Sequence, residues 1–143
     1  MKRIYIAGKL NDLAVDYLLN VHKMMVTAEE VRKAGYSIYV PAIDLLMGIA
    51  FGYTKYEDYF NNSQPWLEAS DAVFLTPGWE TSKGTEKEIK TALEKKIPVF
   101  DNLTEMNNYF LVKNPTGIII GLQDLEPDYH QVSPIKAGSL TFQ

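Results

Sequence analysis

The chain has 143 residues, 46% of them hydrophobic, and a formal net charge of −4. This length suits one domain with one core, and the apolar content is too high for a disordered chain. The negative charge and the dispersed lysines and arginines argue against binding of nucleic acid through its phosphates. No apolar run approaches the roughly 20 residues that cross a bilayer, and the one at the N-terminus is too short for a secretory signal. We therefore expect neither a nucleic-acid partner nor a membrane partner.

Cysteine is absent, and the only histidines are His22 and His130. The lack of cysteine excludes disulfides, thiolate metal sites and cysteine nucleophiles. It also fits the reducing cytoplasm, where we expect the protein to act. The two histidines are not spaced like metal ligands. We predict neither a metal nor an organic cofactor.

A strand, a helix and a second strand are predicted at the start of the chain. Residues 3–7 predict a buried strand that ends at Gly8. Residues 12–33 predict a helix, because apolar side chains recur at steps of three and four, and Gly35 is typical of the residue that ends one. Residues 36–40 predict the second strand. This order implies two parallel strands joined by a right-handed crossover.

The rest of the chain continues this alternation. Residues 42–60 are irregular and aromatic, which predicts a loop or a broken helix. The elements expected after it are a helix over about 55–69 that Pro65 weakens, strand 71–76, helix 85–95, strand 97–100, helix 104–112 and strand 117–121. We expect an α/β fold with a doubly wound (Rossmann or flavodoxin-like), mainly parallel sheet of about five strands and helices on both faces. Residues 1–122 would form the domain and residues 123–143 an extended C-terminal tail.

Such a fold predicts where a ligand binds, because ligands of open α/β sheets lie beyond the carboxyl ends of the strands. Three segments meet there: residues 8–10, the residues after Val40, and residues 78–84. The last segment combines two glycines and two hydroxyl residues directly before a predicted helix. Free N–H groups at such a helix start suit an anion. The segment matches neither the P-loop nor the dinucleotide-binding fingerprint.

Glu88 is the strongest candidate for chemistry in this region. In the first turn of the predicted helix, the helix dipole would lower its pKa and favour the ionised carboxylate that a nucleophile needs. Its alignment with Ala92 at i+4 lets the side chain point toward the sheet. A structural role fits as well, because Thr85 and Glu88 have the spacing of a capping box. The local pattern alone favours the capping box.

Three segments, in order and at matching intervals, resemble a known family over about residues 3–100. They are residues 4–8 (IYIAG), residues 66–73 (WLEASDAV) and the G-x-x-x-E of residues 84–88. The family is the nucleoside 2-deoxyribosyltransferase superfamily, which includes 2′-deoxynucleoside 5′-phosphate N-hydrolases. Residues 75–84 (LTPGWETSKG) are especially similar to its small uncharacterised phage and bacterial members.

The resemblance assigns roles to individual residues. It implies that Glu88 attacks C1′ of a 2-deoxyribosyl group and that Tyr5 orients this carboxylate. Ser82 would bind a 5′-phosphate, and Lys9 stands where the family more often has a serine that reaches the phosphate. Simpler readings are a turn residue for Ser82 and a solvated loop lysine for Lys9. The remaining residues expected to bind substrate are Gly8, Ser63, Gly78 and Gly84.

The chain departs from the family at one position. Members commonly carry an Asp eight residues before the third-strand Asp, where it contacts the sugar or helps to protonate the base. Counting back from Asp71 gives Ser63. Asp58 or Glu80 substitutes for the missing acid, or the leaving group needs less help, or the activity is lost. The aromatic residues between Tyr39 and Trp66 fit either a wall for a nucleobase or core and interface packing.

The sequence therefore favours an N-glycosidic-bond enzyme, a hydrolase or a deoxyribosyl transferase. Its substrate would be a 2′-deoxynucleoside or the 5′-monophosphate, processed through a covalent glycosyl–Glu88 intermediate. The family usually forms homo-oligomers, so the resemblance implies a dimer or a larger assembly. One alternative is a non-catalytic nucleotide-binding or sensing module on the same scaffold. Another is a transferase for an unusual sugar or modified base, with Ser63 reflecting altered sugar recognition.

Overall fold

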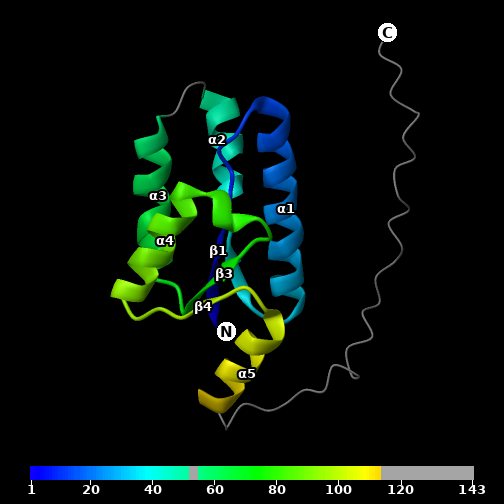
Figure 1. Ribbon diagram of the computed structural model, residues 1–143, viewed down its shortest axis with the longest axis vertical. Helices are drawn as coiled ribbons and strands as arrows, with labels where there is room; N and C mark the ends of the chain where they lie inside the picture. The colour runs from blue at the N-terminus through cyan, green and yellow to red at the C-terminus, as the bar shows by residue number, and fades with distance from the viewer. Residues whose placement is uncertain (52–54, 114–143) are drawn as a thin grey trace, which may run out of the picture.

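Strands and helices alternate along the chain in the computed structural model, which describes residues 1–51 and 55–113 (Figure 1). The elements are β1 (Arg3–Ala7), α1 (Ala14–Lys33), β2 (Ser37–Tyr39), the 3₁₀ turn η1 (Pro41–Ile43), α2 (Asp44–Phe51), α3 (Tyr56–Glu68), β3 (Ala72–Leu75), the 3₁₀ turn η2 (Trp79–Thr81), α4 (Lys83–Glu94), β4 (Val99–Phe100) and α5 (Leu103–Lys113). No helix in these two ranges is long and apolar enough to cross a membrane.

The described strands form one parallel sheet in the order β2-β1-β3-β4. From β1 the chain first moves outward to β2 and then returns to place β3 on the other side of β1. The point where the direction reverses, between β1 and β3, is where doubly wound folds leave room for a ligand. The predicted doubly wound, parallel α/β fold is confirmed.

Alternating side chains of β1 enter two separate cores, one on each face of the sheet. Ile4 and Ile6 pack with buried residues of α1 and α5, including Met24 and Met106. Tyr5 and Ala7 point the other way and pack with residues of α3 and α4. Figure 1 shows α1 on one side of the strands and α3 and α4 on the other. Because side chains alternate along a strand, this register directs Tyr5 toward α4.

Several element boundaries differ from the sequence-based predictions. Residues 44–51 form the regular helix α2, inside the stretch predicted as a loop or broken helix. Helix α3 continues through Pro65, and the Ser70 hydroxyl donates a hydrogen bond to the Trp66 carbonyl at the helix end. Helix α4 begins at Lys83, two residues before the predicted start. The predicted strand 117–121 and the predicted tail 123–143 lie outside the described residues.

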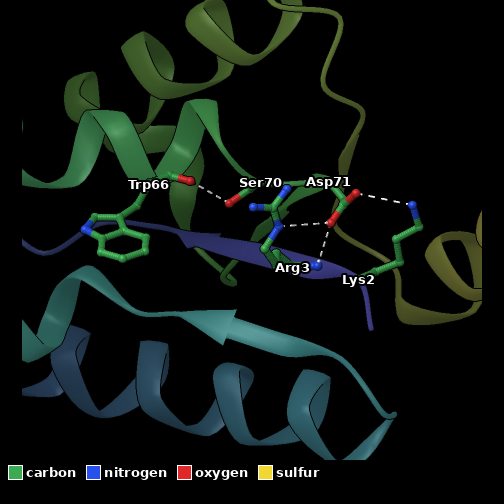
Figure 2. Close-up of polar contacts among 5 residues, drawn as sticks. All are labelled: Lys2, Arg3, Trp66, Ser70 and Asp71. Carbon is green, nitrogen blue, oxygen red and sulfur yellow. Dashed lines mark hydrogen bonds and ion pairs between the residues drawn. The ribbon is translucent and has the colours of Figure 1, made fainter.

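Asp71 joins the starts of β1 and β3 (Figure 2). Its carboxylate accepts hydrogen bonds from the Arg3 backbone N–H at 2.8 Å, from Arg3 Nε at 3.5 Å and from Lys2 Nζ at 3.2 Å. Its own N–H donates to the Arg3 carbonyl at 2.7 Å. Desolvation raises the pKa of Asp71, but the bonds from Arg3 and Lys2 outweigh it, and the pKa is lowered overall. Asp71 therefore fixes the register at the amino edge of the sheet.

Replacing Asp71 by alanine should lower the free energy of unfolding by about 1–2 kcal/mol, because a charged acceptor of a backbone N–H is lost. The loss should be present at neutral pH and disappear as the pH falls through the lowered pKa, where the wild-type carboxylate is itself protonated. Urea denaturation at pH 7 and pH 3 measures both values. The control is Glu94→Ala, which removes an exposed ion pair with Lys90 and should cost less than about 0.5 kcal/mol.

Candidate active site

A cavity of about 770 Å³ opens at the carboxyl edge of the sheet. Its lining comes from the loop after β1, from α1, from the start of α2, from α3, and from the segment that enters α4. These are the segments that the doubly wound topology brings together beyond the strand ends. The predicted location of a ligand site at this edge therefore coincides with the larger of the two cavities described.

Glu88 projects from α4 to this cavity and meets Tyr5 of β1. The Tyr5 hydroxyl donates a hydrogen bond of 2.7 Å to Glu88 Oε1. Tyr5 is fully buried, whereas Glu88 is only half-buried and lines the cavity. The carboxylate is thus held from the protein side by a rigid donor while it remains open to a ligand.

The capping-box interpretation of Glu88 is wrong. Helix α4 starts at Lys83, its N-cap is Ser82, and the Ser82 Oγ accepts a hydrogen bond from the Thr85 N–H at 3.2 Å. Thr85 is therefore already inside the helix, with its hydroxyl buried and without a partner among the described residues. Glu88 falls in the second turn, too far along to reach back to the N-cap, and its side chain is free to bind Tyr5.

The predicted lowering of the Glu88 pKa is also wrong. Burial raises the pKa to about 7, and the hydrogen bond from Tyr5 only partly opposes that shift. The helix dipole acts mainly on the first turn, which ends before Glu88. Burial, followed by the charge of Glu88, raises the pKa of Tyr5 well above its ordinary value. Tyr5 therefore stays protonated and acts as a donor.

The raised pKa predicts that Glu88 destabilises the fold at high pH. Between pH 4.5 and about 7 the folded state binds more protons than the unfolded state, so this contribution to stability is lost as the pH rises. Glu88→Gln keeps an acceptor for Tyr5 and should raise the free energy of unfolding by about 1–3 kcal/mol at pH 8, with a difference near zero at pH 4.

Denaturant titrations of both proteins at the two pH values measure this difference. The control is Glu86→Gln, on the exposed side of the same helix, which should change stability by less than about 0.5 kcal/mol at either pH. A Glu88→Gln protein no more stable than wild type at pH 8 would contradict the burial of this charge.

Most of the other predicted site residues line the same cavity: Gly8, Lys9, Ser63, Ser82 and Gly84. Gly8 is required by close packing, because a Cβ there would overlap the Thr76 side chain on β3. Ser63 is buried and donates to the Phe60 carbonyl at 3.3 Å. Lys9 forms an ion pair with Asp12 at 2.6 Å, so it is not a simple solvated lysine.

Gly78 does not belong to this group. It adopts a left-handed backbone conformation with φ of 87° and turns the chain into η2, where it lines a second, smaller cavity of about 280 Å³. The two proposed substitutes for the missing acid are also placed elsewhere. Asp58 accepts a hydrogen bond from the Lys55 N–H at the start of α3, and Glu80 is exposed on η2. Neither lines the larger cavity.

The sequence reasoning missed Asp44, which begins α2 and lines the cavity opposite the α4 side. Asn62 of α3 donates to both of its carboxylate oxygens at 3.4 Å. Desolvation raises the pKa of Asp44, and this hydrogen bond lowers it in part. Asp44 follows β2 and Pro41 closely, and this position at the carboxyl end of a predicted strand could have identified it. It was overlooked because residues 42–60 were predicted to be a loop or a broken helix.

In residues 1–51 and 55–113, no group of three or more His, Asp or Glu side chains is arranged to hold a metal ion. The polar groups of the cavity are two carboxyls, three lysines, several hydroxyls and the start of a helix. This set suits a polar organic ligand with an anionic end, because lysines and helix N–H groups attract anions.

The fold and the cavity define a doubly wound α/β domain with a tyrosine-bound glutamate at the carboxyl edge of its sheet. By sequence, the chain belongs to the family described as domain of unknown function DUF4406, whose model matches residues 2–101. The match spans all the strands described and the segments that line the cavity. Comparisons with curated proteins and with solved structures gave no match.

Proposed function

We propose that this protein is a cytoplasmic N-glycosidic-bond enzyme acting on a 2′-deoxynucleoside or its 5′-monophosphate. The observation that carries the proposal is the 2.7 Å hydrogen bond from buried Tyr5 to Glu88, which lines the cavity. A buried donor that fixes one oxygen leaves the other free to approach a ligand. Such an oriented carboxylate is what covalent glycoside chemistry requires.

The reaction would proceed in two displacements. Ionised Glu88 attacks C1′, the C1′–N bond breaks through an oxocarbenium-like transition state, and the base leaves with the bonding electron pair and gains a proton. The product is a glycosyl ester of Glu88. Water then attacks C1′ in a hydrolase, or a second base does so in a transferase, and Glu88 is released as a carboxylate. Tyr5 holds the carboxylate throughout, which limits the motion that would misalign the attack.

The cations of the cavity favour the 5′-monophosphate over the free nucleoside. Lys9, Lys83 and Lys87 all line it, and Gly84 places an N–H at the second position of α4 that has no acceptor within the helix. The Ser82 oxygen already accepts the Thr85 N–H, but its hydroxyl hydrogen remains available to a phosphate oxygen. Each of these groups would attract a dianionic phosphate or donate a hydrogen bond to its oxygens.

We also propose that the chain forms a homo-oligomer. The outer faces of α1 and α2 expose large apolar side chains: Leu18, Met25, Leu46, Met47 and Phe51. Single exposed apolar residues are common, but several on α1 and several on α2 favour contact with another protein surface. Because Asp44 begins α2, a second copy packed there would also border the cavity.

The direct test incubates the purified protein with 2′-deoxynucleosides and their 5′-monophosphates and measures free base by liquid chromatography. We expect base release by wild type, a loss of about 10³-fold or more in Glu88→Ala, and a decrease of about 10- to 100-fold in Tyr5→Phe. Glu86→Gln serves as the control and should retain full activity. A parallel panel of ribo- and arabino-substrates tests the alternative of an unusual sugar.

Saturable nucleotide binding without any base release, unchanged in Glu88→Gln, would instead support the sensing module. Ser63 supports that alternative, because its hydroxyl cannot act as the carboxylic acid that the family commonly has at this position.

The pKa of Glu88 sets the pH dependence of the reaction. Attack requires the ionised form, so kcat/KM should rise about tenfold per pH unit below pH 7 and level off above the pKa of about 7. Initial rates of base release between pH 5 and pH 9 measure this ascending limb. A limb centred near pH 4.5 would show that Glu88 is ionised as easily as an exposed glutamate, contrary to its burial.

A further inference from the structure

The cavity contains a second carboxylate that the mechanism above does not use. Asp44 and Glu88 are the two acidic residues among the described residues that line it. Asp44 begins α2, which follows β2, whereas Glu88 lies on α4, which follows β3. Since β1 lies between β2 and β3, the two carboxylates enter the cavity from opposite sides of the central strand. A ligand between them would meet one acid on each side.

Side chains hold Asp44 in this position. Asn62 Nδ2 donates to Asp44 Oδ1 and Oδ2 at 3.4 Å and to the Tyr39 hydroxyl at 3.3 Å. The Tyr39 ring in turn stacks on Tyr5 with 5.6 Å between ring centroids. Tyr5 binds Glu88. One continuous set of contacts therefore links Asp44 to Glu88 and holds both carboxylates.

The packing of α2 on α3 also fixes Asp44. Gly48 lies one helical turn after Asp44, and a Cβ at this position would overlap the Tyr59 hydroxyl. The absence of a side chain lets α2 approach Tyr59, which itself lines the cavity. This close approach places the start of α2 at the ligand edge rather than in solvent.

Departure of a nucleobase needs a proton on the base nitrogen, and the expected donor is missing. Ser63 has a weakly acidic hydroxyl, already bound to the Phe60 carbonyl. Asp58 and Glu80 lie outside the cavity. We propose that Asp44 is the general acid of this enzyme, so that the acid function resides at the start of α2 instead of on α3. This inference rests on the proposed function.

The proton balance is complete with these two residues. As Glu88 attacks C1′ and the C1′–N bond breaks, the bonding electron pair passes to the base nitrogen, which takes the proton from Asp44. In the second step the Asp44 carboxylate removes a proton from the attacking water, or from the acceptor base, as the new bond to C1′ forms and the Glu88 ester is released. Asp44 therefore returns to its protonated form after each cycle.

The electrostatic surroundings allow Asp44 to hold a proton. The groups that face it are phenols and an amide: Tyr17 of α1, Tyr39 of β2, and Asn62 of α3. The charged groups of the same cavity are Glu88 and the lysines at 9, 83 and 87. Burial raises the pKa of both Asp44 and Glu88, and the raised pKa of Asp44 favours its protonated form.

The test compares Asp44→Asn with wild type on two leaving groups. If wild type releases a purine, the pair is 2′-deoxyguanosine 5′-monophosphate and its 7-methyl derivative, whose cationic base departs without a proton. If it releases a pyrimidine, the pair is the 5′-monophosphates of 2′-deoxyuridine and 5-nitro-2′-deoxyuridine, whose base is a far better leaving group.

Asp44→Asn should lower kcat for the ordinary base by about 10²- to 10⁴-fold and for the activated base by less than about threefold. Asp44→Glu should recover part of the activity. The matched control is Asp58→Asn, which changes a carboxylate outside the cavity and should leave both rates at the wild-type level.

Full activity of Asp44→Asn on the ordinary base would overturn the assignment. An equal loss on both substrates would also overturn it, because Asp44 would then bind substrate or maintain shape instead of delivering a proton. The failure of the proposed function looks different: wild type releases neither base, or Glu88→Gln releases both at the wild-type rate.

Discussion

The hydrogen bond between Tyr5 and Glu88 joins the centre of the sheet to the helix that borders the cavity. It depends on the alternation of side chains along β1, because only the face that carries Tyr5 and Ala7 packs against α4. A shift of one residue in this strand would turn the phenol toward α1 and leave the carboxylate without its donor. The hydrogen bond at the cavity therefore requires both the observed register of β1 and the observed start of α4.

Burial of Glu88 has an energetic cost that the fold tolerates. A carboxylate whose pKa is raised by desolvation is less stable in the folded protein than in water, and a side chain kept only for packing would not need to be ionisable. Such local instability, compensated by the two apolar cores on either face of the sheet, is common where a protein performs chemistry.

The alternation of strands and helices and the edge where the larger described cavity opens followed from the sequence, because both depend on periodicity and on topological rules. Details that depend on exact local geometry did not. The start of α4 was misplaced because Ser82 and Thr85 are both good N-cap residues, and only coordinates show which one caps the helix. Asp44 was missed because its importance comes from long-range contacts with Asn62 and with the cavity, which short-range patterns do not encode.

The amino edge and the carboxyl edge of the sheet differ in what their residues contact. Asp71 binds Lys2 and Arg3 at the amino edge of the sheet (Figure 2). The cavity opens beyond the opposite, carboxyl ends of the strands. Substitutions around the opening should therefore change the shape and charge of the cavity without loosening the contacts that align the strands.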